Sequence, residues 1–151
     1  MANLHDITEA VTIQLEDIMA KPVIAVTANE TATKCAVRMK EKDIGGLVVL
    51  VKGKPAGMVT ERDLVKRVLA IGANPDVAKV RDFMSTPLVT ARPDMEVQEA
   101  VELMKRKDIR RLVVMDGEEL SGIVTSRDVM TYMRSYVDSR LKDLIFATSW
   151  W

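Results

Sequence analysis

Two seven-residue segments of this chain combine residue types that can hold a ligand with hydroxyl groups and negative charge. Residues 57–63 read Gly-Met-Val-Thr-Glu-Arg-Asp, and residues 122–128 read Gly-Ile-Val-Thr-Ser-Arg-Asp. In each, a strand pattern is followed by a helical pattern, so the start of the helix would present unpaired backbone N–H groups and the positive end of its dipole. The aspartate can accept two hydrogen bonds from a vicinal diol such as a ribose, and the glycine lets a ligand approach the backbone.

The same residues also have a purely structural interpretation. Thr-x-x-Asp ahead of an apolar helix is a capping-box pattern, which stabilises the helix by about 1 kcal/mol and binds nothing. Capping alone does not explain why glycine, valine and arginine recur with the threonine and the aspartate in both segments. The recurrence favours a second demand on the motif, although common descent of two copies would retain part of it. Both interpretations stay open.

The two motifs belong to an internal repeat that is found by shifting the sequence by 65 positions, the distance from Asp17 to Asp82. No gap is needed, and Leu47-Val48-Val49 then falls on Leu112-Val113-Val114. Self-similarity of this kind indicates two copies of one structural unit. The predicted organisation is an N-terminal segment (1–14), a first repeat (15–69), a linker (70–79), a second repeat (80–134) and a C-terminal helical extension (135–151).

Each copy reads as strand, helix, strand, strand, helix. A short apolar run bounded by a proline comes first, and a continuous apolar run too short for a helix follows the first helical pattern. A unit of about 55 residues with one apolar sheet face and two apolar helix stripes cannot bury them alone. The expected fold is therefore α+β, with the two repeats packed about a pseudo-twofold axis.

The helices have recognisable signals in the sequence. Asn29 and Asp94 are the expected N-caps of the first helix of each copy, and Gly72 is the expected end of the second helix of the first copy. The apolar positions of the first helices follow an i, i+4, i+7 spacing. These positions are Ala32, Ala36 and Met39 in the first copy and Val97, Val101 and Met104 in the second.

The repeated unit, the Gly-x-Val-Thr-x-Arg-Asp motif in both halves and the Met-x-x-Pro openings resemble a tandem pair of cystathionine-beta-synthase (CBS) domains, a stand-alone Bateman module, over about residues 15–134. The resemblance implies that AMP, ADP or ATP, or less often S-adenosylmethionine, binds in clefts between the halves. It implies ribose contacts by Asp63, Asp128, Thr60 and Thr125, an adenine pocket bordered by Met58, Ile123, Ile44 and Ile109, and phosphate contacts by Arg62, Arg110, Arg111 and Arg127.

The two copies differ where phosphate would bind, because the second has Arg110-Arg111 where the first has Gly45-Gly46. Arginine can contact phosphate through two parallel hydrogen bonds. Unequal sites are therefore expected, and the difference favours the Asp128 cleft, with Arg127 and Arg110 as its phosphate contacts.

The composition argues against several function classes. Lysine plus arginine and aspartate plus glutamate both total 22, so no overall field attracts nucleic acid or an anionic membrane. His5 and Cys35 are the only residues of their types, which excludes a disulfide framework, a clustered Cys/His metal site and a Ser-His-Asp triad within the fold. Cys35 corresponds to Ala100 and is interpreted as a packed small residue. We expect that the chain has no enzymatic activity and binds no catalytic cofactor.

Membrane insertion and nucleic-acid binding are not expected either. The longest apolar run, Leu47–Val51, falls far short of the roughly 20 residues of a membrane helix. Residues 105–111 are rich in lysine and arginine, but no aromatic residue is interleaved with them. The prediction is a cytoplasmic protein.

The C-terminal extension carries an apolar stripe that the repeat itself does not use. It comprises Met130, Met133, Val137, Leu141 and Leu144 at helical spacing. A second protomer is the expected cover, with the N-terminal segment or a different protein as alternatives. Trp150 and Trp151 either anchor such a contact or fray. The predicted function is thus a non-catalytic energy or metabolite sensor that acts as a homodimer on an unknown regulated protein. The alternative is an interaction homodimer whose Thr and Asp residues are only caps.

Overall fold

The computed structural model describes the backbone of residues 12–148 and the side chains of residues 12–143. His5, Trp150 and Trp151, and the side chain of Leu144, lie outside the described residues. The elements in chain order are α1 (Leu15–Ile18), β1 (Ala25–Thr27), α2 (Ala32–Lys42), β2 (Gly46–Val51), β3 (Lys54–Thr60), α3 (Glu61–Leu64), the π-helical turn η2 (Val65–Leu69), α4 (Val80–Phe83), β4 (Thr90–Ala91), α5 (Val97–Lys107), β5 (Arg111–Asp116), β6 (Glu119–Thr125) and α6 (Ser126–Thr148). The α+β class is confirmed.

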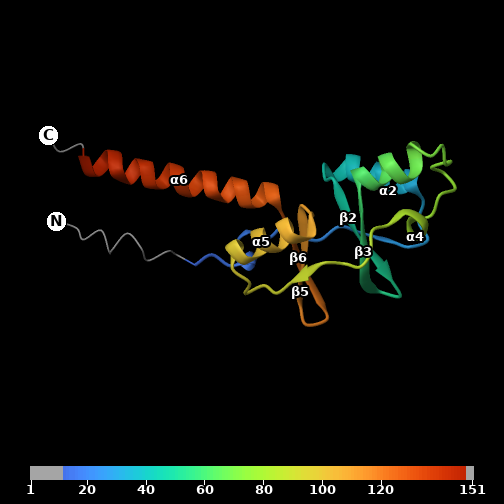
Figure 1. Cartoon of the computed structure of the whole chain (residues 1–151), viewed down its shortest axis with the longest axis horizontal. Helices are drawn as coiled ribbons and strands as arrows, with labels where there is room; N and C mark the ends of the chain where they lie inside the picture. Colours follow the sequence, from blue (N-terminus) through green and yellow to red (C-terminus); the bar gives the residue numbers. More distant parts are fainter. Residues whose placement is uncertain (1–11, 149–151) are drawn as a thin grey trace.

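Each half contains a three-stranded sheet of the same topology (Figure 1). The first strand is parallel to the central strand, and the third is antiparallel to it, in the orders β1-β2-β3 and β4-β5-β6. The apolar central strands are buried on both faces, since Leu47, Val48 and Val49 and their counterparts Leu112, Val113 and Val114 are all 0% exposed. This explains why their sequence is a continuous apolar run and not an alternating one.

The opening segments of the two repeats cross over and pack against the opposite half. Leu15 of α1 is buried in the core of the second half, and Val80 and Phe83 of α4 are buried in the core of the first. The backbone then pairs with the third strand there, through bridges Ala20–Ile123 and Met58–Ser85. Each packed half therefore contains the opening segment of the other sequence repeat. This exchange of α1 and α4 connects the two halves.

In helices α2 and α5, the buried face differs from the predicted one. Cys35 and Ala100, which are 0% exposed, face the cores, whereas the expected positions Ala36 and Val101 are exposed. The buried stripe thus follows an i, i+3, i+7 spacing, which fits the helix period equally well.

The predicted N-caps Asn29 and Asp94 are also wrong. Thr31 caps α2 by accepting from the Lys34 N–H at 3.3 Å, and Glu96 precedes α5 without a side-chain cap. Asn29 instead accepts a hydrogen bond from Arg81. The expected stop at Gly72 is confirmed, because this glycine has a φ of 71° and donates to the Leu69 carbonyl just after η2.

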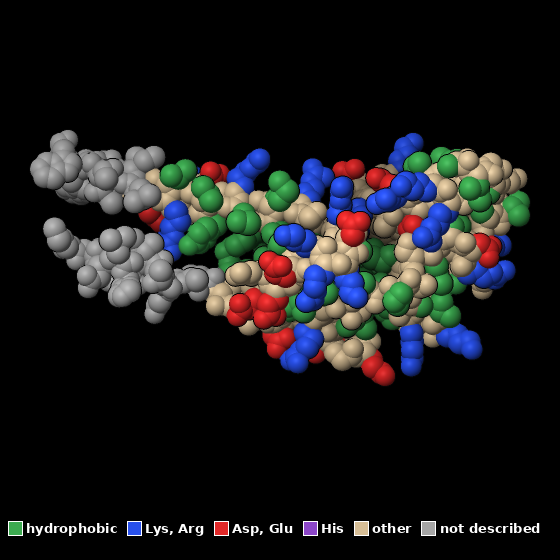
Figure 2. Space-filling view, viewed as in Figure 1, with side chains coloured by type: hydrophobic (Ala, Val, Ile, Leu, Met, Phe, Trp, Pro, Cys, Tyr) green, Lys and Arg blue, Asp and Glu red, His purple; other side chains and the backbone are tan. Residues whose placement is uncertain are grey.

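The last helix, α6, continues beyond the body of the molecule as a projecting rod (Figure 1). Four members of the predicted stripe are exposed there: Met130 is 70%, Met133 58%, Val137 50% and Leu141 52% exposed. Hydrophobic side chains accordingly line the projecting helix in the space-filling view (Figure 2). Among the described residues, no helix is long and apolar enough to cross a membrane.

Candidate functional site

Both motifs lie where a strand ends and a helix begins, at two equivalent positions that we call the first junction (Thr60–Asp63) and the second junction (Thr125–Asp128). In each, the threonine N–H donates to the Oδ2 atom of the aspartate, at 2.9 and 2.8 Å. The aspartate N–H donates back to the threonine Oγ1, at 3.3 and 3.2 Å. Both capping boxes of the structural interpretation are therefore present, and each uses one carboxylate oxygen.

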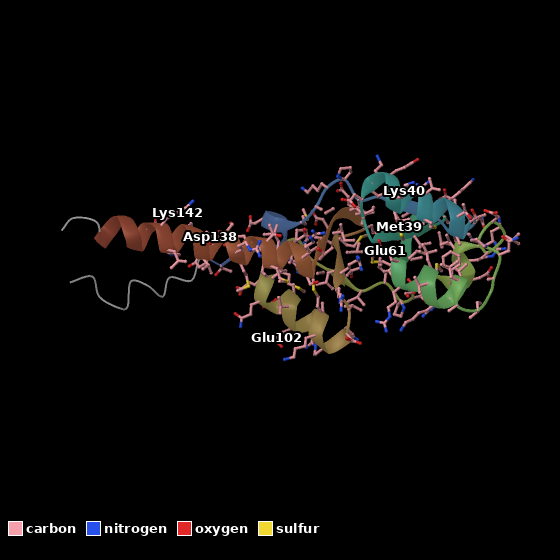
Figure 3. All side chains as sticks on the ribbon, turned by 90° about the horizontal axis from the view of Figure 1, so that it is seen from above. Met39, Lys40, Glu61, Glu102, Asp138 and Lys142 are labelled. Atoms are coloured by element: carbon pink, nitrogen blue, oxygen red, sulfur yellow. The ribbon has the colours of Figure 1, made fainter. Side chains whose placement is uncertain are left out.

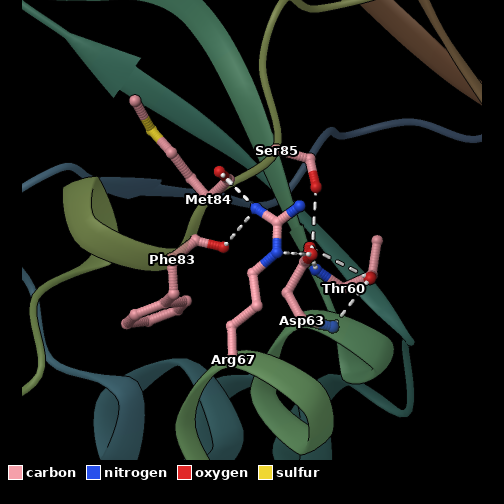
Figure 4. A network of polar contacts seen from close by, with 6 residues as sticks. All are labelled: Thr60, Asp63, Arg67, Phe83, Met84 and Ser85. Atoms are coloured by element: carbon pink, nitrogen blue, oxygen red, sulfur yellow. Dashed lines mark hydrogen bonds and ion pairs between the residues drawn. The ribbon is translucent and has the colours of Figure 1, made fainter.

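The other carboxylate oxygen distinguishes the two junctions. Asp63 is only 6% exposed, and its Oδ1 accepts from the Ser85 hydroxyl at 2.9 Å and lies 3.7 Å from Arg67 Nε. Arg67 also donates to the Phe83 and Met84 carbonyls at 3.3 and 3.1 Å (Figure 4). The first carboxylate is thus fully engaged by protein groups, which we call the Asp63 network.

The second junction has no such network among the described residues. Asp128 is half-buried, and no described donor reaches its Oδ1. The reason lies in the repeat: the positions of Ser85 and Arg67 are taken by Ala20 and Tyr132 in the other copy. A carboxylate oxygen that is accessible and without a protein donor can accept hydrogen bonds from a ligand.

Arg111 reaches across from the second half to the first. A Cβ on Gly45 would lie 2.7 Å from Arg111 Nη2, and one on Gly46 would lie 2.9 Å from its Nε. The two glycines therefore make room for the arginine, and a Cβ on Gly45 would also lie 3.4 Å from the Glu61 carboxylate at the first junction. Figure 3 shows Glu61 near the middle of the molecule, where the halves meet. The Arg110-Arg111 pair is thus divided, because Arg111 extends toward the first junction.

Arg110 lies beside the second junction. Its carbonyl accepts from the Ser126 N–H at 2.9 Å, which fixes this residue at the start of α6. The side chains of Arg110, Arg127 and Arg62 are all exposed. Arg127 directly precedes Asp128 in the sequence, and the backbone hydrogen bond to Ser126 brings Arg110 to the start of the same helix, so both arginines are near this junction and available to solvent. Arg62 occupies the place equivalent to that of Arg127 at the first junction.

The residues predicted to border an adenine fall into two groups. Met58 and Ile123 are half-buried on the third strands, directly opposite Ser85 and Ala20. Ile44 and Ile109 are half-buried and pack against the cores of their own halves. Both groups present part of their surface near the junctions.

The motif glycines have a structural role that the sequence interpretation missed. A Cβ on Gly57 would lie 2.6 Å from the Ser85 carbonyl oxygen, and one on Gly122 would lie 2.6 Å from Met19 Sδ. Gly57 and Gly122 are required because the crossing segment of the opposite half passes directly over each strand. Close approach by a ligand is not needed to explain them.

Neither metal nor thiol chemistry is indicated at these positions. The described part of the chain contains no group of three or more His, Cys, Asp or Glu side chains placed to hold a metal ion. Burial and the nearby Glu30 charge raise the pKa of the Cys35 thiol to about 11, although Arg38 opposes the shift. Cys35 is therefore a protonated core residue at neutral pH.

Known proteins share this architecture. The family model described as CBS domain matches residues 15–70 and 80–135. An uncharacterized protein of Methanopyrus kandleri is 40% identical over 136 residues, covering 87% of this chain and 69% of that protein. The CBS domain-containing protein YhcV of Bacillus subtilis is 36% identical over 115 residues, covering 76% of this chain and 81% of that protein. The solved structure of the hexameric CBS-CP12 protein from bloom-forming cyanobacteria is similar with a TM-score of 0.75 and 27% identity, covering 92% of this chain and 90% of that chain.

Proposed function

The chain belongs to the CBS-domain family, and from this premise we propose that it is a non-catalytic regulatory module that binds an adenosine nucleotide between its halves. AMP, ADP and ATP are the proposed ligands, with S-adenosylmethionine as a less favoured one. The proposed outcome of binding is a shift in the arrangement of the halves that another protein reads.

The observation that carries the proposal is the carboxylate of Asp128. Its Oδ1 has no donor among the described residues, although the residue is half-buried at the start of a long helix. A ribose supplies two hydroxyl donors for such an oxygen, and the N-terminus of a helix favours the negative charge of phosphate. The exposed Arg110 and Arg127 are the proposed phosphate contacts, and Thr125 and Ile123 the proposed ribose and adenine neighbours.

The first junction is proposed to bind more weakly. A ribose there would have to displace the Ser85 hydroxyl from Asp63, whose side chain is already buried. Arg111 and Arg62 would still offer cations for phosphate near that junction, so we propose one tight site per chain at Asp128 and a weak or empty site at Asp63.

Thermal unfolding with each of the four ligands tests the proposal. A ligand at about 100 times its dissociation constant adds roughly 2.7 kcal/mol of stability, and about 2–4 °C per kcal/mol is expected for this size. Adenosine nucleotides should raise the midpoint of the wild type and of Asp63→Asn by similar amounts, and should raise that of Asp128→Asn clearly less. Equal shifts in all three proteins would contradict the proposal.

The second candidate function is an interaction module without a nucleotide, and the two complete capping boxes favour it. In that case Thr60, Asp63, Thr125 and Asp128 only stabilise helix starts. The thermal series then shows no ligand effect in any protein, and the exposed apolar face of α6 becomes the functional surface.

A further inference from the structure

The two β-hairpins of the molecule end in turns of opposite charge. The turn between β2 and β3 is Lys52-Gly53-Lys54, which we call the basic turn, and the turn between β5 and β6 is Asp116-Gly117-Glu118, followed by Glu119. All of these residues are exposed, and none forms an ion pair within the described part of the chain. Although the net charge of the protein is zero, positive charge is therefore concentrated at the hairpin end of the first half and negative charge at that of the second half.

A groove of about 700 Å³ lies beside the β5–β6 turn. Its carboxylates come from three separate elements, namely Glu16 of α1, Asp94 of the loop after β4, and Asp116 at the end of β5. Arg92 also lines it and is paired with Asp94 at 2.8 Å, so negative charge dominates. Met95 and Met115 add apolar wall. We call this the acidic groove.

At the equivalent positions, the first half carries a single carboxylate, Glu30 in place of Met95, and Arg38 pairs with it at 2.9 Å. Glu16 and Asp94 are replaced there by Arg81 and Asn29, which bond to each other at 2.6 Å, and Asp116 by Val51. The difference is therefore systematic, since three positions exchange a carboxylate for a cationic or neutral residue. A duplicated unit has acquired a basic end in one copy and an acidic end in the other.

Both turns lie on the same side of the molecule, opposite to α6 and α2 (Figure 1). In the space-filling view, lysine and arginine side chains project near the β2–β3 turn and acidic side chains near the β5–β6 turn (Figure 2). We propose that this side is a self-association surface, in which the basic turn of one copy enters the acidic groove of a second copy and the reverse contact forms at the same time.

Twofold symmetry makes the second copy the fitting occupant. A rotation of 180° about an axis between the turns places each basic turn opposite an acidic groove. One symmetric interface therefore contains both turn-to-groove contacts. The surface also lies away from the apolar face of α6, so the two contacts can coexist and extend a dimer to a larger assembly. Because exposed ion pairs are individually weak, the interface requires several of them to form together. Salt screens exposed charges and should therefore weaken the association.

Sedimentation velocity without nucleotide tests the inference. Between about 50 mM and about 500 mM NaCl the Debye length shrinks several-fold, and the wild type should lose a species of twice the mass of the one that persists at high salt. Lys52→Glu/Lys54→Glu should abolish that species at low salt, and so should Asp116→Lys/Glu118→Lys. An equimolar mixture of the two double variants should restore it, because one then presents two acidic ends and the other two basic ends.

The controls separate this contact from unspecific charge effects. Lys40→Glu/Lys42→Glu makes the same charge change on exposed residues of α2 and should leave the species intact. A wild type whose mass does not depend on salt, double variants that still associate, or a mixture that fails to associate would each overturn the inference. A salt-dependent species that only a basic peptide such as oligolysine produces would also overturn it in favour of a foreign partner. All four outcomes are independent of nucleotide binding.

Discussion

At the scale of single residues, Asp63 and Asp128 show how one motif serves two purposes. Both aspartates cap a helix through Oδ2, but only Asp63 also binds Ser85 and lies near Arg67. The difference arises outside the motif, at positions whose counterparts are Ala20 and Tyr132. Burial of a satisfied carboxylate favours structure, whereas an accessible and unsatisfied oxygen favours ligand binding.

The Asp63 network predicts that Asp63→Ala lowers the free energy of unfolding more than Asp128→Ala does. Asp63→Ala should lower the free energy of unfolding by about 2–3 kcal/mol, because it removes a cap, leaves the Ser85 hydroxyl without its acceptor and removes the ion-pair partner of Arg67. Asp128→Ala removes only the cap and should cost about 1 kcal/mol. Urea unfolding of both variants measures the difference, with Ser85→Ala as the intermediate case. Equal costs for the two aspartates would argue against the network.

At the scale of elements, the connection from β1 to α2 is fixed by a charged group that the second half lacks. Glu30 accepts from the Thr27 N–H at 2.7 Å and from Arg38 at 2.9 Å, and Arg38 also donates to the Ala25 carbonyl. Burial alone would raise the pKa of Glu30, but these hydrogen bonds and the Arg38 and Lys34 charges outweigh it and hold the pKa below the usual value of a glutamate. In the second half the equivalent pair is Met95 and Leu103.

This connection predicts a pH-dependent loss of stability. The lowered pKa means that the stabilisation by Glu30 is present above the unperturbed glutamate pKa of about 4.3 and is lost as the pH falls through the lower folded-state pKa. Glu30→Gln should cost about 1 kcal/mol at pH 7, and its difference from the wild type should vanish in acid. Glu30→Met/Arg38→Leu copies the apolar pair of the second half and should be nearly neutral at pH 7. Chemical unfolding of both variants and the wild type, from pH 7 down to acid below the pKa of Glu30, measures these differences in the free energy of unfolding.

The projecting face of α6 predicts a dimer that a single charge disrupts. We propose that its stripe pairs with a second copy, since Val65 and Leu69 on the equivalent helix of the first half are also 55% and 62% exposed. Val137→Glu should convert the dimer to a monomer by placing a charge in an apolar contact. Light scattering after size exclusion measures the mass. Ser135 precedes Val137 by two residues and therefore lies on the opposite face of α6, so Ser135→Glu should leave the dimer intact. A dimer that tolerates Val137→Glu would contradict the contact.

At the scale of the whole molecule, the sequence predicts the repeated units better than their arrangement. The order of elements and the two central strands follow from apolar runs and turn signals that act locally. The exchange of α1 and α4 between halves does not, because no local pattern tells which sheet edge a four-residue helix will join. The same limit applies to the candidate site: the motif residues lie at the expected junctions, but Ser85 and Arg67 become visible only when both halves are packed.

We propose that one nucleotide binds per chain at Asp128, because the carboxylate of Asp128 is open and that of Asp63 is not. Isothermal titration of the wild type with AMP, ADP and ATP, repeated with Asp128→Asn and Asp63→Asn, tests it most directly. We predict about one tight site per chain, an affinity loss of about 10- to 100-fold for Asp128→Asn, and little change for Asp63→Asn. Two equal sites, a loss confined to Asp63→Asn, or no binding of any nucleotide would contradict the claim.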